Sequence, residues 1–176
     1  MYDLNEQRIL EIIFKNPTTK FHLLEIARLS KLHPNTALKT LNKLAKQKMV
    51  NQEKKKHIKE ICANKENPLF SIKKRIFNLK QVYNSEIIDM LIKKFSPEAI
   101  SIMGSYSRGE DIEGSDIDIA VISKKDYEAI NLEKFEKAIG RKVHLIITDY
   151  KKMSNEFYIN LINGIIMYGA LNINKS

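Results

Sequence analysis

Two aspartates alternate with isoleucines at the start of an apolar run, and this pattern constrains the fold more than any other part of the chain. The run from Asp116 to Ile122 is rich in β-branched residues and predicts a strand. Side chains alternate along a strand, so Asp116 and Asp118 should face one side, about 6–7 Å apart, and the isoleucines the other. A solvent-facing acidic loop would not show this alternation. A Gly104-Ser105 pair follows a second predicted strand, Ala99–Met103, and ten residues separate this pair from Asp116.

These residue types are suited to binding a metal ion and phosphate groups. Two neighbouring carboxylates repel each other unless a cation binds them, and oxygen ligands favour Mg²⁺ or Mn²⁺ over zinc. The Gly104-Ser105 corner is expected to open a helix, where backbone N–H groups and the Ser105 hydroxyl can hold phosphate oxygens. Arg108, one turn further on, is a candidate phosphate contact. Ser115 is expected to hold the turn before the first aspartate.

The glycine-serine pair, the spacer and the Asp-x-Asp resemble the nucleotidyltransferase superfamily of the DNA polymerase beta type. They are similar in particular to the minimal nucleotidyltransferases of archaea and bacteria, over residues 85–170. A predicted helix over Ser85–Lys94 fits that family, and Asn163–Tyr168 resembles its closing helix. The resemblance implies an α/β domain with a small mixed β-sheet flanked by helices.

The resemblance also implies a reaction. A nucleoside monophosphate passes from an NTP, ATP first among them, to a protein or RNA hydroxyl, with Mg²⁺ (or Mn²⁺) as cofactor. Asp116 and Asp118 would bind the metal, and Gly104 and Ser105 would hold the triphosphate, with Arg108 and Ser115 as further nucleotide-binding candidates. Minimal members are often antitoxins that modify a toxin, so a toxin is a candidate acceptor.

One position departs from that family. A third carboxylate is expected on a following strand, here Lys142–Thr148, where His144 stands instead. Asp149 lies at odd spacing from His144 and should face the other way. His144 is a candidate substitute base or metal ligand. Two other interpretations stay open: a weakened one-metal site, and a site that binds nucleotide without catalysis. The acidic spacer residues, Asp111 among them, are expected to be ordinary surface charges.

Charge is distributed unevenly between the two halves of the chain. Residues 1–84 hold 18 Lys and Arg against 7 Asp and Glu, a net charge of +11, whereas residues 85–176 hold 12 against 14, a net charge of −2. Such asymmetry indicates that the first half meets a polyanion, with nucleic acid as the favoured partner.

The first half shows the element order of a winged helix-turn-helix. Apolar periodicity predicts helices over Asn5–Lys15, Phe21–Ser30 and Pro34–Gln47, followed by a hairpin of Met49–Glu53 and His57–Cys62. This order resembles the winged-helix superfamily. The third helix would enter the major groove of duplex DNA and reach base edges with Asn35, Thr36 and Lys39. Five further lysines are expected to contact phosphates: Lys43, Lys46 and the wing residues Lys54, Lys55 and Lys56. RNA binding and protein-only contact are the alternatives.

The expected organisation is therefore a winged helix-turn-helix over residues 1–66, a connecting helix over 67–84 and a nucleotidyltransferase-like domain over 85–176. In the connecting helix, Ile72 and Ile76 are expected to face inward and Lys74 outward. The single cysteine, Cys62, and the absence of a signal-like or membrane-spanning run favour a cytoplasmic protein with no membrane partner.

Two functions fit this organisation. The first is a nucleotidyltransferase that its winged helix brings to nucleic acid or to a partner, as in an antitoxin. The second is a DNA-binding transcriptional regulator whose degenerate second domain senses nucleotides. A homodimer is plausible in either case, because winged-helix regulators often bind paired half-sites.

Overall fold

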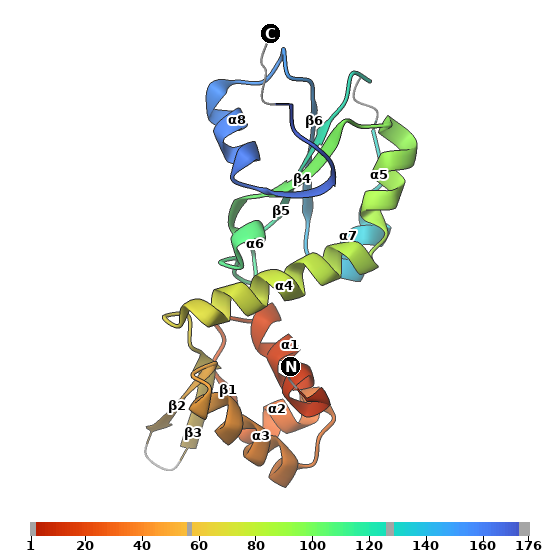
Figure 1. Ribbon diagram of the computed structural model, residues 1–176. Coiled ribbons are helices and arrows are strands. Elements are labelled where there is room, and N and C mark those ends of the chain that lie inside the picture. The colour runs from red at the N-terminus through yellow and green to blue at the C-terminus, as the bar shows by residue number, and fades with distance from the viewer. Residues whose placement is uncertain (1–2, 56–57, 126–128, 173–176) are drawn as a thin grey trace. The chain divides into compact units, whose positions relative to one another are not determined.

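The computed structural model describes residues 3–55, 58–125 and 129–172, which belong to two compact units, Met1–Phe77 and Asn78–Ser176 (Figure 1). The boundary between the units falls inside helix α4 (Pro68–Asn84). Phe70 and Phe77 of this helix pack in the apolar core of the first unit, whereas Leu79 and Val82 pack in a core of the second. Each unit therefore has an apolar core of its own.

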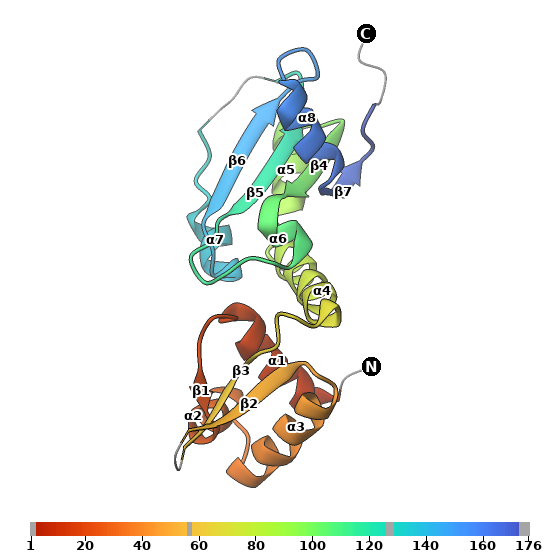
Figure 2. The same ribbon diagram turned by 90° about the vertical axis from the view of Figure 1, so that its left-hand side faces the viewer.

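The first unit combines three helices with a small antiparallel sheet (Figure 2). Its elements before α4 are α1 (Leu4–Lys15), β1 (Phe21–His22), α2 (Leu23–Ser30), α3 (Pro34–Lys46), β2 (Val50–Lys55) and β3 (Ile58–Ala63). The strand order is β1-β3-β2. The sequence predicted Phe21 and His22 as the first turn of a helix, and that prediction was wrong. Phe21 instead pairs with Ile61 of β3 and buries its ring, so tertiary pairing outweighs the local helical pattern.

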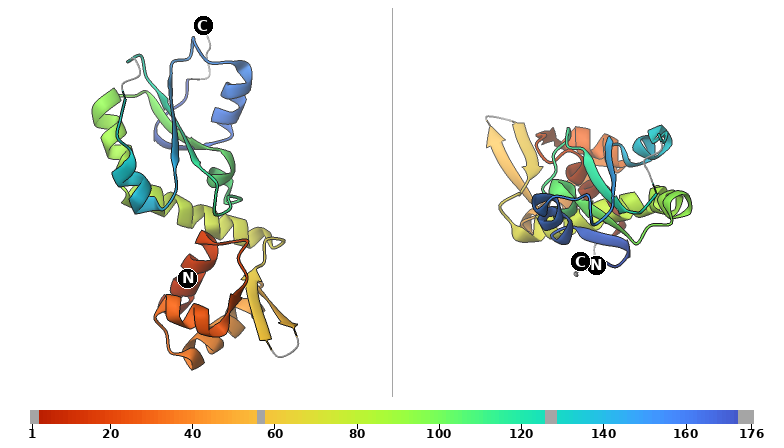
Figure 3. Two further views of the ribbon diagram at one scale, coloured as in Figure 1. Left: turned by 180° about the vertical axis from the view of Figure 1, so that it is seen from behind. Right: turned by 90° about the horizontal axis from the view of Figure 1, so that it is seen from above.

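The second unit is a mixed sheet flanked by helices, as the resemblance implied. After α4 its elements are α5 (Ile87–Phe95), β4 (Ala99–Met103), α6 (Gly104–Arg108), β5 (Ile117–Ile122), α7 (Glu133–Ile139), β6 (Val143–Thr148), α8 (Asn155–Ile162) and β7 (Ile165–Gly169). The strand order is β6-β5-β4-β7, with β5 and β6 parallel and the other pairs antiparallel. Helices α5 and α7 cover one face of the sheet and α8 the other (Figures 1 and 3).

The closing helix expected over Asn163–Tyr168 is a strand in the structure. Strand β7 occupies residues 165–169 and pairs with β4, with Ile165 opposite Ile102, and the helix lies upstream as α8. The β-branched residues there suit the open edge of the sheet. Gly164 makes the turn possible, because a Cβ at this position would lie 2.5 Å from Ser101 Oγ and 2.7 Å from the Ile102 carbonyl oxygen.

Helix α4 turns a different face inward from the one its isoleucines predicted. Ile72 and Ile76 are about half exposed, at 51% and 57%, whereas Lys74 is buried, with 1% exposure. Phe70, Lys74 and Phe77 share one side of the helix by their spacing, and the two large rings bury more apolar area than the isoleucines would. Among the described residues, no helix is both long and apolar enough to span a membrane.

Candidate active site

The antiparallel pairing of β4 with β5 brings the Gly-Ser corner to the aspartates. Met103 at the end of β4 lies opposite Asp118 near the start of β5. Gly104 follows Met103 and adopts a left-handed backbone conformation, with φ of +69°. A Cβ on Gly104 would lie only 2.6 Å from Asp118 Oδ2, so the aspartate carboxylate packs directly on the glycine backbone. Through residues 106–115 the chain thus returns to the end of β4, beside the Gly-Ser corner.

His144 lies beside Asp118 on the neighbouring strand. The parallel pairing of β5 with β6 places Asp118 opposite His144, on the sheet face that α8 covers further along. His144 Nδ1 is 3.0 Å from Asp118 Oδ1, and their side chains are 63% and 38% exposed. Asp149 is excluded from this site by its position at the far end of β6. Its Oδ1 accepts hydrogen bonds from the backbone N–H groups of Lys151 and Lys152 at 2.8 and 3.0 Å.

Asp116 comes directly before β5 and is exposed to solvent. The negative charge of Asp116 acts on Lys142, whose ammonium group lies 2.9 Å from Glu136 Oε2. Glu136 raises the pKa of Lys142 most strongly, and the negative charge of Asp116 adds a smaller contribution. Glu136 Oε1 also accepts a hydrogen bond from the Val143 N–H at 3.0 Å, which fastens α7 to the strand that carries His144.

The other predicted nucleotide-binding residues flank this centre. Ser105 is half-buried in α6. Ser115 Oγ accepts a hydrogen bond from the Ile112 N–H at 2.9 Å, so this side chain does hold the turn before Asp116. Arg108 Nε donates to Glu110 Oε2 at 2.6 Å in an exposed ion pair. A phosphate would have to compete with Glu110 for the guanidinium group of Arg108.

A buried polar cluster holds α6 and the following loop in place. Sequence patterns did not predict this cluster. The Asn78 amide donates to the Tyr106 carbonyl oxygen at 2.9 Å and to Asp111 Oδ1 at 2.7 Å. Arg141 Nη2 lies 3.9 Å from Asp111 Oδ2, and Arg141 Nη1 donates to the Glu113 carbonyl oxygen at 2.7 Å. Asp111 is only 2% exposed, so the expectation of a surface charge was wrong. No spacing rule links these residues, because they come from α4, α6, the loop and the turn before β6.

The donor set at this end of the sheet suits a hard divalent cation shared with substrate phosphates. Among residues 3–55, 58–125 and 129–172, no group of three or more His, Cys, Asp or Glu side chains is arranged to hold a metal ion. Asp116 and Asp118 nevertheless match the one or two carboxylates that Mg²⁺ usually takes from a protein, where water and phosphate complete its shell. Because Gly104 has no Cβ, Asp118 Oδ2 can occupy the space that a side chain would fill. The residues present therefore fit such an ion.

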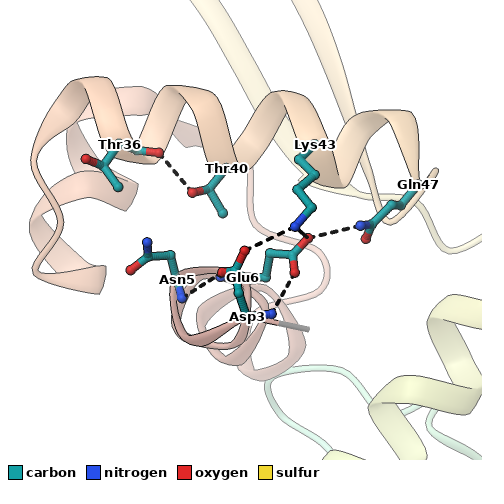
Figure 4. A network of polar contacts seen from close by, with 7 residues as sticks. All are labelled: Asp3, Asn5, Glu6, Thr36, Thr40, Lys43 and Gln47. Atoms are coloured by element: carbon teal, nitrogen blue, oxygen red, sulfur yellow. Dashed lines mark hydrogen bonds and ion pairs between the residues drawn. The ribbon is translucent and has the colours of Figure 1, made fainter. Parts of the chain in front are cut away.

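The first unit holds the predicted nucleic-acid contacts of α3, and one of them, Lys43, belongs to a polar network between α3 and α1 (Figure 4). Lys43 Nζ lies 3.1 Å from Asp3 Oδ2 and 3.2 Å from Glu6 Oε1. Gln47 Nε2 donates to the same Glu6 oxygen at 3.0 Å, and Glu6 is 1% exposed. Lys43 thus faces α1, and acidic partners balance its charge.

Asn35, Lys39 and Lys46 are exposed along α3, whereas Thr36 is half-buried. Thr36 lies toward the α1 side with Lys43 in Figure 4, and its carbonyl oxygen accepts the Thr40 hydroxyl at 2.9 Å. The backbone of Lys54 and Lys55 belongs to β2. Their side chains, and the whole of Lys56, lie outside the described residues.

The mixed sheet, the Gly-Ser corner after β4 and the Asp-x-Asp at β5 together define a nucleotidyltransferase domain. Residues 85–167 match the family model described as "Nucleotidyltransferase domain". A Methanocaldococcus jannaschii protein named "Putative protein adenylyltransferase" is 39% identical over 75 residues, a match that covers 35% of this chain and 75% of that protein. The chain belongs to the nucleotidyltransferase domain family.

A solved structure described as "Crystal structure of the toxin-antitoxin with AMP-PNP" contains a chain with 26% sequence identity to this one. The match covers 49% of this chain and 74% of that chain, with a TM-score of 0.39. A TM-score this low does not establish that the two chains share a fold.

Proposed function

We propose that the second unit is a metal-dependent nucleotidyltransferase that moves a nucleoside monophosphate from an NTP to a hydroxyl group. The observation that carries this proposal is the contact between Asp118 and Gly104. It joins the aspartate that would bind the metal to the corner that would hold the triphosphate, where the end of β4 pairs with the start of β5. Asp116, exposed two residues earlier, is the second carboxylate of the same centre.

In this reaction the acceptor oxygen forms a bond to the α-phosphorus, and the bond from that phosphorus to the bridging oxygen breaks. Pyrophosphate leaves with the bonding electrons. The hydroxyl proton passes to solvent, which reaches the site because the side chains of Asp116 and His144 are exposed. Mg²⁺ or Mn²⁺, when bound, neutralises charge on the attacking and leaving oxygens. The residues of this chain contribute position: Asp116 and Asp118 would hold the cation, and Ser105 and the Gly104 backbone would orient the phosphates.

A protein hydroxyl is the favoured acceptor and ATP the favoured donor. The name of the relative from Methanocaldococcus jannaschii supports both choices, since it describes an adenylyltransferase that acts on protein. The resemblance to minimal nucleotidyltransferases adds a cognate toxin as a candidate acceptor. An RNA hydroxyl is the alternative that the same chemistry permits.

The first unit would bring this activity to duplex DNA or to a partner as a winged helix-turn-helix. Support comes from its element order, three helices with a three-stranded antiparallel sheet, and from the net charge of +11 over residues 1–84. Asn35, Lys39 and Lys46 are exposed residues of α3 that would face the groove. Lys43 would serve the helix packing instead.

A label-transfer assay tests the proposed activity. The full chain is incubated with each α-labelled NTP, Mg²⁺ or Mn²⁺, and cell protein or RNA as acceptor. Asp118→Asn keeps the size of the side chain, so transfer should fall by about 100-fold or more while the thermal unfolding temperature changes little. Asp89→Asn, a change to an exposed carboxylate on α5, is the matched control and should retain full activity. Equal transfer by Asp118→Asn and the wild type would overturn the proposal.

A second candidate function is a DNA-binding regulator that senses nucleotides without transferring them. The observation in its favour is that His144 occupies the position beside Asp118 where the resemblance implies a third carboxylate. This alternative predicts saturable binding of an NTP to folded protein with no label transfer to any acceptor. Nucleotide binding combined with transfer would exclude it.

A further inference from the structure

The pairing of Asp118 with His144 is an unusual donor set for a nucleotidyltransferase site, because it joins an oxygen and a nitrogen. The two residues are direct neighbours on parallel strands, and their side chains lie on the same face of the sheet. Asp118 Oδ1 and His144 Nδ1 are 3.0 Å apart. Both side chains are accessible, at 38% and 63% exposure, so an ion in solvent can reach them.

The carboxylate of Asp118 is held in a defined orientation. Its Oδ2 lies against Gly104, so close that a Cβ on the glycine would be 2.6 Å away. Its Oδ1 is therefore the oxygen turned toward His144. The glycine backbone limits rotation of the carboxylate on one side, and Asp118 Oδ1 lies 3.0 Å from the imidazole nitrogen.

The distance between these two atoms suits two neighbouring ligands of one cation. Ligand bonds of about 2.1 Å in an octahedral shell place adjacent ligand atoms about 3.0 Å apart. Mg²⁺ prefers carboxylate, carbonyl and water oxygens, whereas later divalent metals also bind imidazole well. Mn²⁺ binds carboxylate and phosphate oxygens as Mg²⁺ does. As a first-row transition metal, Mn²⁺ also accepts a nitrogen ligand more readily than Mg²⁺ does.

We infer that His144 is a metal ligand together with Asp118, and that it makes this site select Mn²⁺ over Mg²⁺ when a nucleoside triphosphate is bound. This inference rests on the proposed function, since phosphate oxygens must complete the shell. Two side chains are too few to hold the ion alone, in keeping with the absence of a three-residue cluster among the described residues. In the metal-bound protein the imidazole nitrogen contacts the ion instead of Asp118.

The test is pulsed electron paramagnetic resonance of Mn²⁺ on the full chain, with a non-hydrolysable ATP analogue. A ligated imidazole modulates the Mn²⁺ echo through its nitrogen. Wild-type protein should show this modulation, and His144→Ala should lose it. His144→Asp should still bind Mn²⁺ without the modulation. His33→Asn, a change to an exposed histidine of the first unit, should leave the signal unchanged.

Competition titrations with Mg²⁺ measure the selectivity. The ratio of Mg²⁺ to Mn²⁺ dissociation constants should fall by about tenfold or more in His144→Asp, as expected when a metal site loses a specific partner. Modulation that persists in His144→Ala, bound Mn²⁺ with no nitrogen modulation in wild type, or no Mn²⁺ binding at all would each overturn the inference.

The proposed transfer reaction can fail or succeed independently of this result. Label transfer with no nitrogen modulation would leave the nucleotidyltransferase proposal standing and remove the metal role of His144. Nitrogen modulation without label transfer would support the metal role of His144 and remove the nucleotidyltransferase proposal. It would favour the nucleotide-sensing alternative.

Discussion

At the scale of single residues, two separate features require glycine at position 104: its backbone conformation and its contact with Asp118. Its φ of +69° strains any other residue, and the space of a Cβ is already taken by Asp118 Oδ2. Gly104→Ala should therefore cost about 1–2 kcal/mol in the free energy of unfolding for the backbone conformation. It should also displace the Asp118 carboxylate and abolish nucleotide-dependent metal binding. Chemical denaturation and metal titration in the presence of an ATP analogue measure the two effects.

Two other glycines separate the effect of the backbone conformation from the effect of the contact with Asp118. Gly140 has a φ of +78° but nothing within 4 Å of its Cβ position, so Gly140→Ala should show the cost in stability and keep metal binding. Gly114 lies in the same loop as the site with open space around it, and Gly114→Ala should change neither quantity appreciably. If Gly140→Ala lost metal binding as fully as Gly104→Ala, backbone strain rather than the contact with Asp118 would be responsible.

At the scale of elements, α1 is fastened to α3 through charged groups whose effect depends on pH. The Glu6 backbone N–H, followed by the Lys43 ammonium group, lowers the pKa of Asp3 from its ordinary value of 3.8. The folded protein therefore takes up this proton less readily than the unfolded chain. The stability that Asp3 contributes is present above pH 3.8 and is lost as the pH falls through the lower folded-state value.

Asp3→Asn tests this linkage, since asparagine can still cap α1 but cannot ionise. The wild type should be more stable than Asp3→Asn near pH 6, and the difference should shrink as the pH drops below 3.8. Urea denaturation from pH 3 to 7 measures it. Glu11→Gln, a change to an exposed carboxylate on the same helix, is the control. A difference between wild type and Asp3→Asn that stays constant over this range would contradict the assigned cause.

The elements also show where sequence patterns are informative and where they fail. The alternation of aspartates with isoleucines predicted strand β5, which begins at Ile117, because period-two patterns depend only on strand geometry. The family resemblance placed His144 on the following strand, where a third carboxylate was expected, and the structure pairs this residue with Asp118. Strand β7 and the inward face of α4 were predicted wrongly, because pairing with β4 and competition between aromatic and aliphatic side chains decide them. The Asn78–Asp111–Arg141 cluster joins distant segments, so only the folded chain reveals it.

At the scale of the whole molecule, the charge difference between the two halves of the chain predicts where nucleic acid binds. If α3 contacts duplex DNA, Lys39→Ala and Lys46→Ala should each weaken binding at all sequences. Each should also lower the slope of log affinity against log salt by about 0.9, because one phosphate fewer is neutralised. Lys43→Ala should leave the slope nearly unchanged, because Asp3 and Glu6 already balance that charge and raise the pKa of Lys43. Fluorescence anisotropy of labelled duplexes at several salt concentrations measures the slopes, with Lys93→Ala on α5 as the matched control. An equal weakening by Lys93→Ala would mean that net charge alone, rather than the exposed side of α3, attracts the DNA.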